Sequence, residues 1–393
     1  MRVLFVSDVY FPRVNGVSTS IRTFRQDLSA HGVETQLVAP HYEAAPAAAE
    51  EPGVLRVASA GVPRDPEDRR MRWGALTRVL DELVPSGFDL VHIHTPFIAH
   101  YAGVRFARRA GIAAVATYHT FFEEYLHHYL PVLPRAAGRW LARSFTRSQC
   151  DDVRGLIAPS EPMRAVLLAY GVTTPIHVLP TGLAGDRFRA GDGRAFRARA
   201  GIARDARLVT YIGRVAHEKN IGFLVQTFRE VLKRVPQAVL VIAGEGPARP
   251  ALQQQVASLG LGSHVHFAGY LDRDTALLDC YAAADVFVFA SRTETQGLVL
   301  LEAMAQGAPV VSTAELGTRS ILLPGSGALV VPEERDVFAA AVVRVLEDRE
   351  LHQELSQRGR VYARNWSSSA MAGRLTELYG TLRGAPGTAG VAA

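Results

Sequence analysis

Short apolar runs alternate with longer helical stretches along most of the chain. In the first half, the β-rich apolar runs that predict strands lie at residues 3–7, 34–39, 54–58, 90–94, 113–117, 155–158 and 176–179. Strands that are separated by helices pair in parallel and are buried on both faces. The first half therefore predicts a doubly wound, Rossmann-like α/β domain with a parallel sheet.

The same alternation restarts in the second half and predicts a second domain of the same class. Its expected strands lie at residues 208–212, 238–243, 264–268, 286–290, 309–312 and 328–331. Residues 351–382 have a helical pattern with a break at 365–367, where Ser367 could cap a new helix. Because open parallel sheets bind ligands at the carboxyl ends of their strands, we expect the two domains to face each other across a ligand-binding cleft.

These patterns set the expected domain boundaries. They are a first domain at 1–182, a linker rich in Gly, Arg, Asp and Ala at 183–206, a second domain at 207–365, a final helix at 366–383 that crosses back to the first domain, and a flexible tail at 384–393. The length of 393 residues, with 48% hydrophobic and 21% charged residues, fits two globular domains.

The chain carries few signals for a compartment other than the cytosol. Its two cysteines, Cys150 and Cys280, supply neither a disulfide framework nor a cysteine-rich metal site. The first apolar run is cut short by Asp8 and is too brief for a signal peptide, and no apolar run is long enough to span a membrane. We expect a cytoplasmic protein whose contact with a membrane, if there is any, is peripheral at the inner face.

The charge balance favours anionic partners, with a formal net charge of +5 and a pI near 9.3. Arg135, Arg139, Arg143 and Arg147 recur every four residues and would form one stripe of a helix, with Trp140, Leu141 and Phe145 available to its other faces. Such a helix could rest on anionic lipid, or the stripe could be the solvent face of a helix packed into its own domain. Both interpretations stay open at this point.

The first chemical motif follows the strand that ends at Ile212. Gly213 permits close approach of the backbone, and Arg214 and Lys219 precede a helix predicted over 221–234. A helix N-terminus beside two cations favours binding of a diphosphate.

The second motif follows the strand at 286–290. Glu294 lies in the loop and Glu302 about one turn into the next helix, so one carboxylate could bind sugar hydroxyls and the other ribose hydroxyls. Glu302 stands in an apolar stretch, where a charged group needs a partner. The backbone N–H groups at the helix start, which could bind the phosphates between them, belong to Gly297, Leu298 and Val299.

The segment from Glu294 to Glu302, two glutamates separated by seven residues, resembles the signature of retaining glycosyltransferases of family four, which have the GT-B fold. Residues 11–17, 158–161, 213–219 and 244–247 resemble further loops of that family, so the resemblance extends over nearly the whole chain. It implies an α/β protein of the GT-B class, with two Rossmann-like domains.

The resemblance also implies roles for single residues. Arg214 and Lys219 would hold the diphosphate and stabilise charge on the leaving nucleotide, in place of a metal ion, so no cofactor is expected. Glu294 would orient the donor sugar and Glu302 the ribose, while Gly16 would let the first-domain loop approach the donor phosphate. Other residues implied at the donor site are Gly213, Gly269, Tyr270, Thr295, Gln296, Gly297, Leu298 and Val299.

His119 follows the strand at 113–117 and therefore lies at a ligand-binding edge. A single histidine is as readily structural as catalytic, but in the family a histidine at this place contacts the donor sugar. The resemblance thus assigns His119 to sugar positioning rather than to general-base catalysis. The run Asp272-Arg273-Asp274 resembles a metal-binding Asp-x-Asp motif only by its letters, and no metal is expected.

Retention of configuration is likewise implied by the family. A double displacement needs a carboxylate nucleophile, which the sequence does not identify, so a front-face route in which the departing phosphate helps to deprotonate the acceptor is preferred. The sequence 294–297 and residues 118–125 resemble the branch that glycosylates diacylglycerol or related lipids. The implied partners are a nucleotide sugar, UDP-glucose, and a lipid or glycan acceptor.

Several alternatives remain open. A GDP-mannose-dependent α-mannosyltransferase acting on a lipid or glycan shares the same motifs, and a sugar-nucleotide epimerase would release nucleotide without an acceptor. A dinucleotide-dependent oxidoreductase is disfavoured because the loop at 7–16 lacks the Gly-x-Gly-x-x-Gly turn. A non-enzymatic anion-binding or nucleic-acid-binding protein is the alternative of another class, although the arginines lack interleaved aromatic residues, so nucleic acid is not an expected partner.

Overall fold

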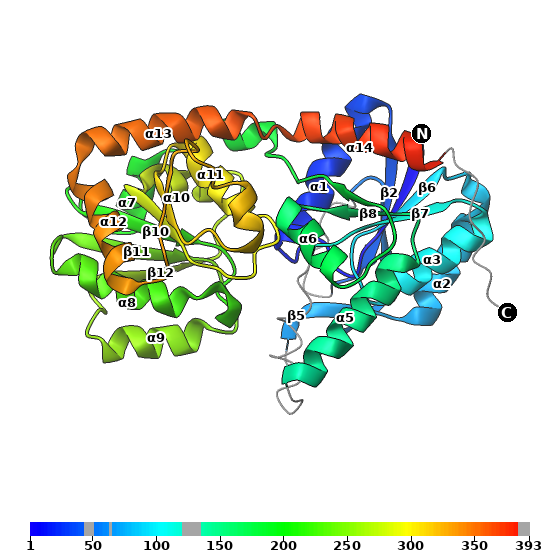
Figure 1. Ribbon diagram of the computed structural model, residues 1–393, viewed down its shortest axis with the longest axis horizontal. Coiled ribbons are helices and arrows are strands. Elements are labelled where there is room, and N and C mark those ends of the chain that lie inside the picture. Colours follow the sequence, from blue (N-terminus) through cyan, green and yellow to red (C-terminus); the bar gives the residue numbers. More distant parts are fainter. Residues whose placement is uncertain (43–50, 63–64, 120–134, 384–393) are drawn as a thin grey trace. The chain divides into compact units, whose positions relative to one another are not determined.

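The computed structural model describes residues 1–42, 51–62, 65–119 and 135–383. The chain divides into two compact units, one formed by Met1–Gly182 with the segment from Ser368 onward, and the other by Leu183–Ser367. Each unit is a parallel sheet with helices on both faces, which confirms the predicted fold class (Figure 1). The predicted tail at 384–393 lies outside the described residues.

Among its described residues, the first unit has a seven-stranded parallel sheet in the order β3-β2-β1-β6-β7-β8-β9. The strands are β1 (Arg2–Val6), β2 (Glu34–Pro40), β3 (Val54–Val57), β6 (Leu90–Ile93), β7 (Ala113–Thr117), β8 (Gly155–Ala158) and β9 (Ile176–Val178). These confirm the expected strands of the first half to within one residue. The antiparallel pair β4 (Ser59–Val62) and β5 (Asp65–Met71) was not predicted, because β5 is almost wholly polar.

Successive side chains of β1 point to opposite faces of this sheet, and each face is covered by helices. Val3 and Phe5 lie in one core with Phe24 of α1 and Tyr379 of α14, while the intervening Leu4 points to the opposite face. α1 and α14 lie side by side on the first face, and α2 contacts α3 (Figure 1). The helices are α1 (Gly16–Leu28), α2 (Trp73–Leu83), α3 (Ile98–Ala110), α5 (Arg135–Asp151), α6 (Glu161–Ala169) and α14 (Ser368–Arg383).

The last two helices are separated at the expected place. α13 (Arg349–Arg364) ends just before the predicted break, and α14 begins at Ser368. Leu375 and Tyr379 of α14 are fully buried in the core of the first unit. α14 therefore belongs to the first unit although it follows the second unit in sequence. No helix among the described residues combines the length and the apolar character that crossing a membrane requires.

The second unit has a parallel sheet in the order β12-β11-β10-β13-β14-β15. Its strands are β10 (Arg207–Ile212), β11 (Ala238–Ala243), β12 (Val265–Gly269), β13 (Val286–Phe289), β14 (Val310–Ser312) and β15 (Ala328–Val330), which again confirm the predicted strands to within one residue. Along the chain, β10, β11 and β12 are added in one direction, and β13, β14 and β15 are then added on the opposite side of β10. This reversal makes β10 and β13 neighbours, with Val209 opposite Val286.

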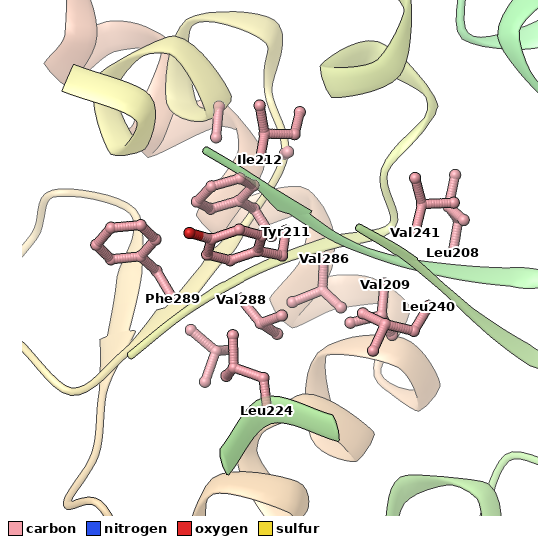
Figure 2. Close-up of a cluster of buried hydrophobic side chains, with 14 of the residues drawn as sticks. Leu208, Val209, Tyr211, Ile212, Leu224, Leu240, Val241, Val286, Val288 and Phe289 are labelled. Atoms are coloured by element: carbon pink, nitrogen blue, oxygen red, sulfur yellow. The ribbon is translucent and has the colours of Figure 1, made fainter. Parts of the chain in front are cut away.

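A continuous apolar core supports this sheet. Figure 2 shows side chains of β10, β11 and β13 clustered with Leu224 of α8, and the rings of Tyr211 and Phe289 stack with centroids 6.0 Å apart. α8 and α9 lie on one side of the sheet in Figure 1, and α10 and α11 on the other. The helices of the unit are α7 (Gly193–Arg199), α8 (Ile221–Leu232), α9 (Arg249–Ser258), α10 (Ala276–Ala283), α11 (Leu298–Gln306), α12 (Arg335–Glu347) and α13.

The segment 183–206, expected to be the hinge or linker between the domains, is instead a folded part of the second unit. It contains a 3₁₀ turn, η3 (Gly185–Phe188), and helix α7, which packs on α10. Phe196 is buried in the second core, and the side-chain amide of Gln306 donates to the carbonyl oxygens of Arg187 and Arg189. The polar composition suggested a linker, but one buried aromatic ring and these hydrogen bonds hold the segment in place.

Asp8 ties together two neighbouring strand ends of the first unit. It follows β1, and its carboxylate accepts hydrogen bonds from the Thr95 hydroxyl at 2.8 Å and from the backbone N–H of Ala99 at 3.1 Å. Burial raises the pKa of Asp8 to about 6, although the hydrogen bonds oppose that shift. The loop after β1 is thus fixed to the start of α3.

Truncation of Leu375 tests the contribution of α14 to the first unit. Because this side chain is fully buried among residues of α1 and the first sheet, Leu375→Ala should lower the free energy of unfolding by about 2–5 kcal/mol. Urea unfolding of the whole chain measures the change. Leu168→Ala, at a side chain that is 48% exposed, is the matched control and should have little effect. Equal effects of the two substitutions would contradict the packing described for α14.

Asp8 gives the first unit a stability that depends on pH. A raised pKa means that the native state holds this proton more tightly than the unfolded chain does, so the contribution of Asp8 falls as the pH rises from about 4 to 6. Asp8→Asn cannot ionise. Its unfolding free energy relative to wild type should therefore shift in favour of the variant by about 2–3 kcal/mol between pH 4 and pH 7. A difference that does not vary with pH would show that Asp8 titrates normally.

Candidate active site

The two motifs found in the sequence meet at one edge of the second sheet. The loop that carries Gly213, Arg214 and Lys219 leaves the carboxyl end of β10, and the loop that carries Glu294 leaves the carboxyl end of β13. Because β10 and β13 are neighbours at the reversal of strand order, their loops converge at the position where open α/β sheets bind ligands.

An ion pair joins the two loops. The ammonium group of Lys219 lies 2.6 Å from a carboxylate oxygen of Glu294, and the two side chains are 13% and 21% exposed. Lys219 ends a 3₁₀ turn, η4 (His217–Lys219), and Asn220 follows in the left-handed region with φ 56° before α8 begins. This turn aims the lysine back across the sheet edge toward β13.

Arg214 is held both through its backbone and through its side chain. The buried hydroxyl of Tyr211 donates to the Arg214 carbonyl oxygen at 3.0 Å, and burial raises the pKa of Tyr211 well above its usual range, so the hydroxyl stays protonated. The guanidinium lies 3.3 Å from a carboxylate oxygen of Glu218, one turn along the loop. Arg214 and Lys219 thus place two cations at the start of α8.

Glycines let the loops at this edge approach each other closely. Gly244 follows β11 with φ 125°, and a Cβ atom there would overlap the carbonyl oxygen of Gly213. Its N–H donates to the carbonyl oxygen of Gly269 at 2.8 Å, at the end of β12. Tyr270, the next residue, is 52% exposed. The sequence-predicted loops after β10, β11 and β12 therefore form one packed surface.

The start of α11 is built from the second motif. Gly297 caps the helix in the left-handed region with φ 100°, Gln296 is buried before it, and Leu298 and Val299 form the first turn. The first backbone N–H groups of a helix have no partner within it, so this turn can bind an anion. The N–H of Gly317 donates to the Glu294 carbonyl oxygen at 2.8 Å.

Gly317 also lets a second loop pack closely against the backbone of the second motif. A Cβ atom on Gly317 would overlap the carbonyl oxygen of Thr295, so only glycine fits behind this turn. The motif is therefore held from behind by the 3₁₀ turn η5 (Leu316–Ser320). No local feature of the sequence predicted this support.

Glu302 is almost fully buried, with 4% exposure, and it has the partners that its apolar surroundings require. One carboxylate oxygen accepts from the Arg273 guanidinium at 3.0 Å, and the other from the Tyr281 hydroxyl at 2.9 Å. Burial, followed by the charge of Glu302, raises the pKa of Tyr281 well above its usual range. Each carboxylate oxygen can accept more than one hydrogen bond, so these contacts leave Glu302 able to accept ligand hydroxyls.

Arg273 and Tyr281 were not among the predicted site residues. Arg273 lies within the letters Asp-Arg-Asp, which draw attention to the carboxylates as metal ligands rather than to the arginine between them. Tyr281 lies on α10 and has no local signal, because its hydroxyl meets Glu302 only through packing of α10 on α11. In the described parts of the chain, no group of three or more His, Cys, Asp or Glu side chains could hold a metal ion.

Two predicted donor residues lie in the first unit. Gly16 is the first residue of α1, whose N-cap Asn15 accepts a hydrogen bond from the N–H of Ser18 at 2.9 Å. His119 follows β7, and its Nε2 lies 3.2 Å from Nδ1 of His94, which follows the neighbouring strand β6. Burial lowers the pKa of His119 to about 4, so its ring is neutral at neutral pH.

The arginine stripe lies on α5. Ala142, Thr146 and Cys150 are buried along one side of this helix, whereas Trp140 is 68% exposed and Leu141 43% exposed. Arg139, Arg143 and Arg147 are exposed, and the guanidinium of Arg143 lies over the ring of Tyr170. The side chain of Arg135 and most of the segment 118–125 lie outside the described residues.

Comparison with known families matches both halves of the chain. Residues 14–187 match the model described as Glycosyltransferase Family 4, and residues 192–362 match the model described as Glycosyl transferases group 1. Each match falls mainly in one of the two units, and the second includes the loops after β10 and β13 that carry the two motifs.

Two curated relatives illustrate the range of similar proteins. The alpha-monoglucosyldiacylglycerol synthase of Streptococcus pneumoniae is 32% identical over 79% of this chain and 71% of its own length. A GDP-mannose-dependent alpha-mannosyltransferase of Mycobacterium tuberculosis is 29% identical over 93% of both chains.

Solved structures agree on the architecture. HepE of Anabaena, in complex with UDP-glucose, matches with a TM-score of 0.78 at 17% identity over 97% of this chain and 100% of its own. Sucrose-phosphate synthase of Thermosynechococcus elongatus matches with a TM-score of 0.76 at 22% identity over 97% and 98%. With both sequence models and this fold matched, the chain belongs to the family four, group 1 glycosyltransferases and is a glycosyltransferase of the GT-B type.

Proposed function

We propose that this glycosyltransferase moves a hexose, with retention of configuration, from UDP-glucose to a membrane-lipid acceptor such as diacylglycerol at the cytoplasmic face of a membrane. The observation that carries the proposal is the pair formed by Lys219 and Glu294, since it unites a phosphate-binding cation and a sugar-binding carboxylate at one sheet edge. The proposed donor and acceptor are inferred from the relatives. The proposed reaction chemistry is argued from the residues at the candidate site.

The diphosphate of the donor would bind where positive charge gathers. Arg214 and Lys219 supply two cations, and the first turn of α11 supplies backbone N–H groups. As the bond to the sugar breaks, negative charge grows on the leaving phosphate, and fixed donors at that place lower the barrier. These groups would take the part that a metal ion plays in other transferases.

The two glutamates would hold the two ends of the donor. Glu294 would accept hydrogen bonds from sugar hydroxyls when the phosphates draw Lys219 away from it, and Glu302 would accept from the ribose. The hydrogen bonds from Arg273 and Tyr281 hold the carboxyl group of Glu302 in a fixed orientation. The exposed ring of Tyr270 and the close turn at Gly269 would lie beside the base.

Retention without a protein nucleophile requires the acceptor to attack from the side of the leaving group. In this route the departing phosphate oxygen takes the proton of the acceptor hydroxyl as the new glycosidic bond forms. Arg214 and Lys219 would stabilise that phosphate throughout, which makes them the residues on which the rate depends most. His119 would hold a hydroxyl of the donor sugar and would not act as a base.

The lipid acceptor is supported by two observations. The relative from S. pneumoniae is named as a monoglucosyldiacylglycerol synthase. On α5, the exposed ring of Trp140 lies among exposed arginines, a combination that suits the boundary between water and anionic lipid.

A GDP-mannose-dependent α-mannosyltransferase is the second candidate. It is favoured by the relative from M. tuberculosis, which covers 93% of the chain, whereas the lipid-synthase relative covers 79%. The two candidates share the diphosphate chemistry and differ in the base and the sugar.

A donor screen tests the class and the donor together. Purified protein is mixed with UDP-glucose, UDP-galactose, UDP-N-acetylglucosamine or GDP-mannose, with and without diacylglycerol micelles, and nucleotide release is followed. We expect lipid-stimulated release from UDP-glucose. Lys219→Ala and Glu294→Ala should each lower kcat by about 10²–10³-fold, because each removes a group that acts on the developing charge or on the sugar.

Lys233→Ala is the matched control for that screen, since Lys233 is the C-cap residue of α8 and its side chain is 63% exposed. Its activity should equal that of the wild type. Release from GDP-mannose alone would replace the proposed donor with the second candidate, and nucleotide release without any acceptor dependence would indicate an epimerase or a hydrolase. Full activity of Lys219→Ala would disprove the assignment of the diphosphate site.

Vesicle binding tests the membrane face separately from catalysis. Replacement of Arg139, Arg143 and Arg147 by Gln should weaken binding to phosphatidylglycerol-containing vesicles roughly a hundredfold, since each basic residue near an anionic surface contributes about 1 kcal/mol. Co-sedimentation measures the binding. The matched control replaces Arg349, Arg358 and Arg364, which are exposed on α13. Equal losses in both triple variants would mean that net charge, and not this face of α5, attracts the protein to lipid.

A further inference from the structure

A row of three histidines lies at the carboxyl edge of the first sheet. His92 is on β6, His94 follows that strand, and His119 follows the neighbouring strand β7. The rings of His92 and His94 are 4.0 Å apart between centroids, and those of His94 and His119 are stacked at 5.5 Å. Only His119 has a role in the proposed function, so the other two need an explanation.

His92 is the fixed end of the row. Its Nδ1 lies 2.6 Å from the hydroxyl of Tyr379 on α14, and its Nε2 lies 2.7 Å from the hydroxyl of Thr117 at the end of β7. Both nitrogens are therefore bonded, and the ring cannot rotate. The ring of Phe5 packs against both His92 and His94 and keeps the second ring in place as well.

All three rings are neutral at neutral pH. Burial lowers the pKa of His92 to about 3 and that of His119 to about 4, and burial with the two neighbouring histidines holds the pKa of His94 well below its usual range. A neutral imidazole has one N–H donor and one acceptor nitrogen. Each hydrogen bond in the row therefore fixes the position of a proton.

The bond between His94 and His119 has one favourable direction. It joins Nδ1 of His94 to Nε2 of His119, at 3.2 Å. The other nitrogen of His94, Nε2, is buried and has no hydrogen-bond partner among the described residues. A buried N–H without a partner is less tolerable than a buried lone pair, so the proton of His94 belongs on Nδ1.

We propose that His94 is a positioning residue that donates its Nδ1 proton to Nε2 of His119 and so fixes the proton of His119 on Nδ1. His119 then carries its N–H on Nδ1, and this form of the ring can donate to an oxygen at that position. The proposal rests on the proposed function for the identity of the ligand, a nucleotide sugar, but not for the position of the proton.

This arrangement determines what His119 can do. With Nε2 occupied as an acceptor and Nδ1 protonated, the ring has no lone pair left with which to remove a proton from an acceptor hydroxyl. It can only donate to an oxygen, which suits a sugar hydroxyl or a phosphate. Packing thus selects a binding role for this histidine over general-base catalysis.

Nitrogen NMR of the free protein tests the proton position without any assay of activity. In protein labelled with ¹⁵N-histidine, long-range proton–nitrogen spectra distinguish protonated from unprotonated ring nitrogens, and His119→Gln assigns the signals. We expect His119 with Nδ1 protonated and Nε2 unprotonated, and a shift toward a mixture of both forms in His94→Leu. A wild-type His119 protonated on Nε2, or spectra of His119 unchanged in His94→Leu, would overturn the proposal.

Kinetics provide the second readout. His94→Leu should raise the KM for the nucleotide sugar and lower kcat/KM about tenfold, the effect of one neutral hydrogen bond, with the KM for the acceptor unchanged. His94→Asn keeps an amide N–H close to the position of Nδ1 and should restore most of the loss. His177→Leu, at a half-buried histidine on β9, is the matched control. A fall in kcat alone, not restored by Asn, would indicate a merely structural role and contradict the proposal.

The two readouts separate this inference from the proposed function. If no donor is turned over, the proposed function fails while the nitrogen spectra still decide the position of the proton. If a donor is turned over and the spectra show His119 protonated on Nε2, the inference fails and the proposed function stands.

Discussion

The ion pair between Lys219 and Glu294 depends on the fact that β10 and β13 are neighbours in the second sheet. The two residues are far apart in sequence, and only the reversal of strand order brings the carboxyl ends of their strands together. Without this pairing, Lys219 and Glu294 would each be a largely buried charge that lacks this partner, which is unfavourable. The pair therefore holds a cation and a carboxylate together at one edge of the sheet.

The loops around this pair are held by close backbone packing rather than by bulky side chains. Gly244 leaves room for the carbonyl of Gly213, and Gly317 leaves room for the carbonyl of Thr295. Beneath them, the stacked rings of Tyr211 and Phe289 fill the core at the ends of β10 and β13 (Figure 2). The Tyr211 hydroxyl then continues from this core to the backbone of Arg214. The apolar core therefore also helps to position the backbone of Arg214, because Tyr211 belongs to that core and binds the Arg214 carbonyl oxygen.

In the first unit, polar side chains also join the ends of neighbouring strands, although the residue types differ from those of the second unit. Asp8 and Thr95 join the ends of β1 and β6, and His94 and His119 join the ends of β6 and β7. The row of histidines ends on Tyr379, which α14 contributes from the far end of the chain. The helix α14 consequently supports both the core of this unit and the polar groups at the carboxyl edge of its sheet.

Short apolar runs separated by helical stretches predicted the strands of the two described sheets, and glycine and charge after strand ends predicted the loops that meet beside β10 and β13, because both features are local. The sequence also predicted that Glu302 needs a partner. That Arg273 and Tyr281 are those partners, that the segment 183–206 folds around Phe196, and that three histidines form a row were decided by the tertiary structure. Local pattern fixes which side chains are buried, whereas strand order and helix packing fix which distant side chains meet.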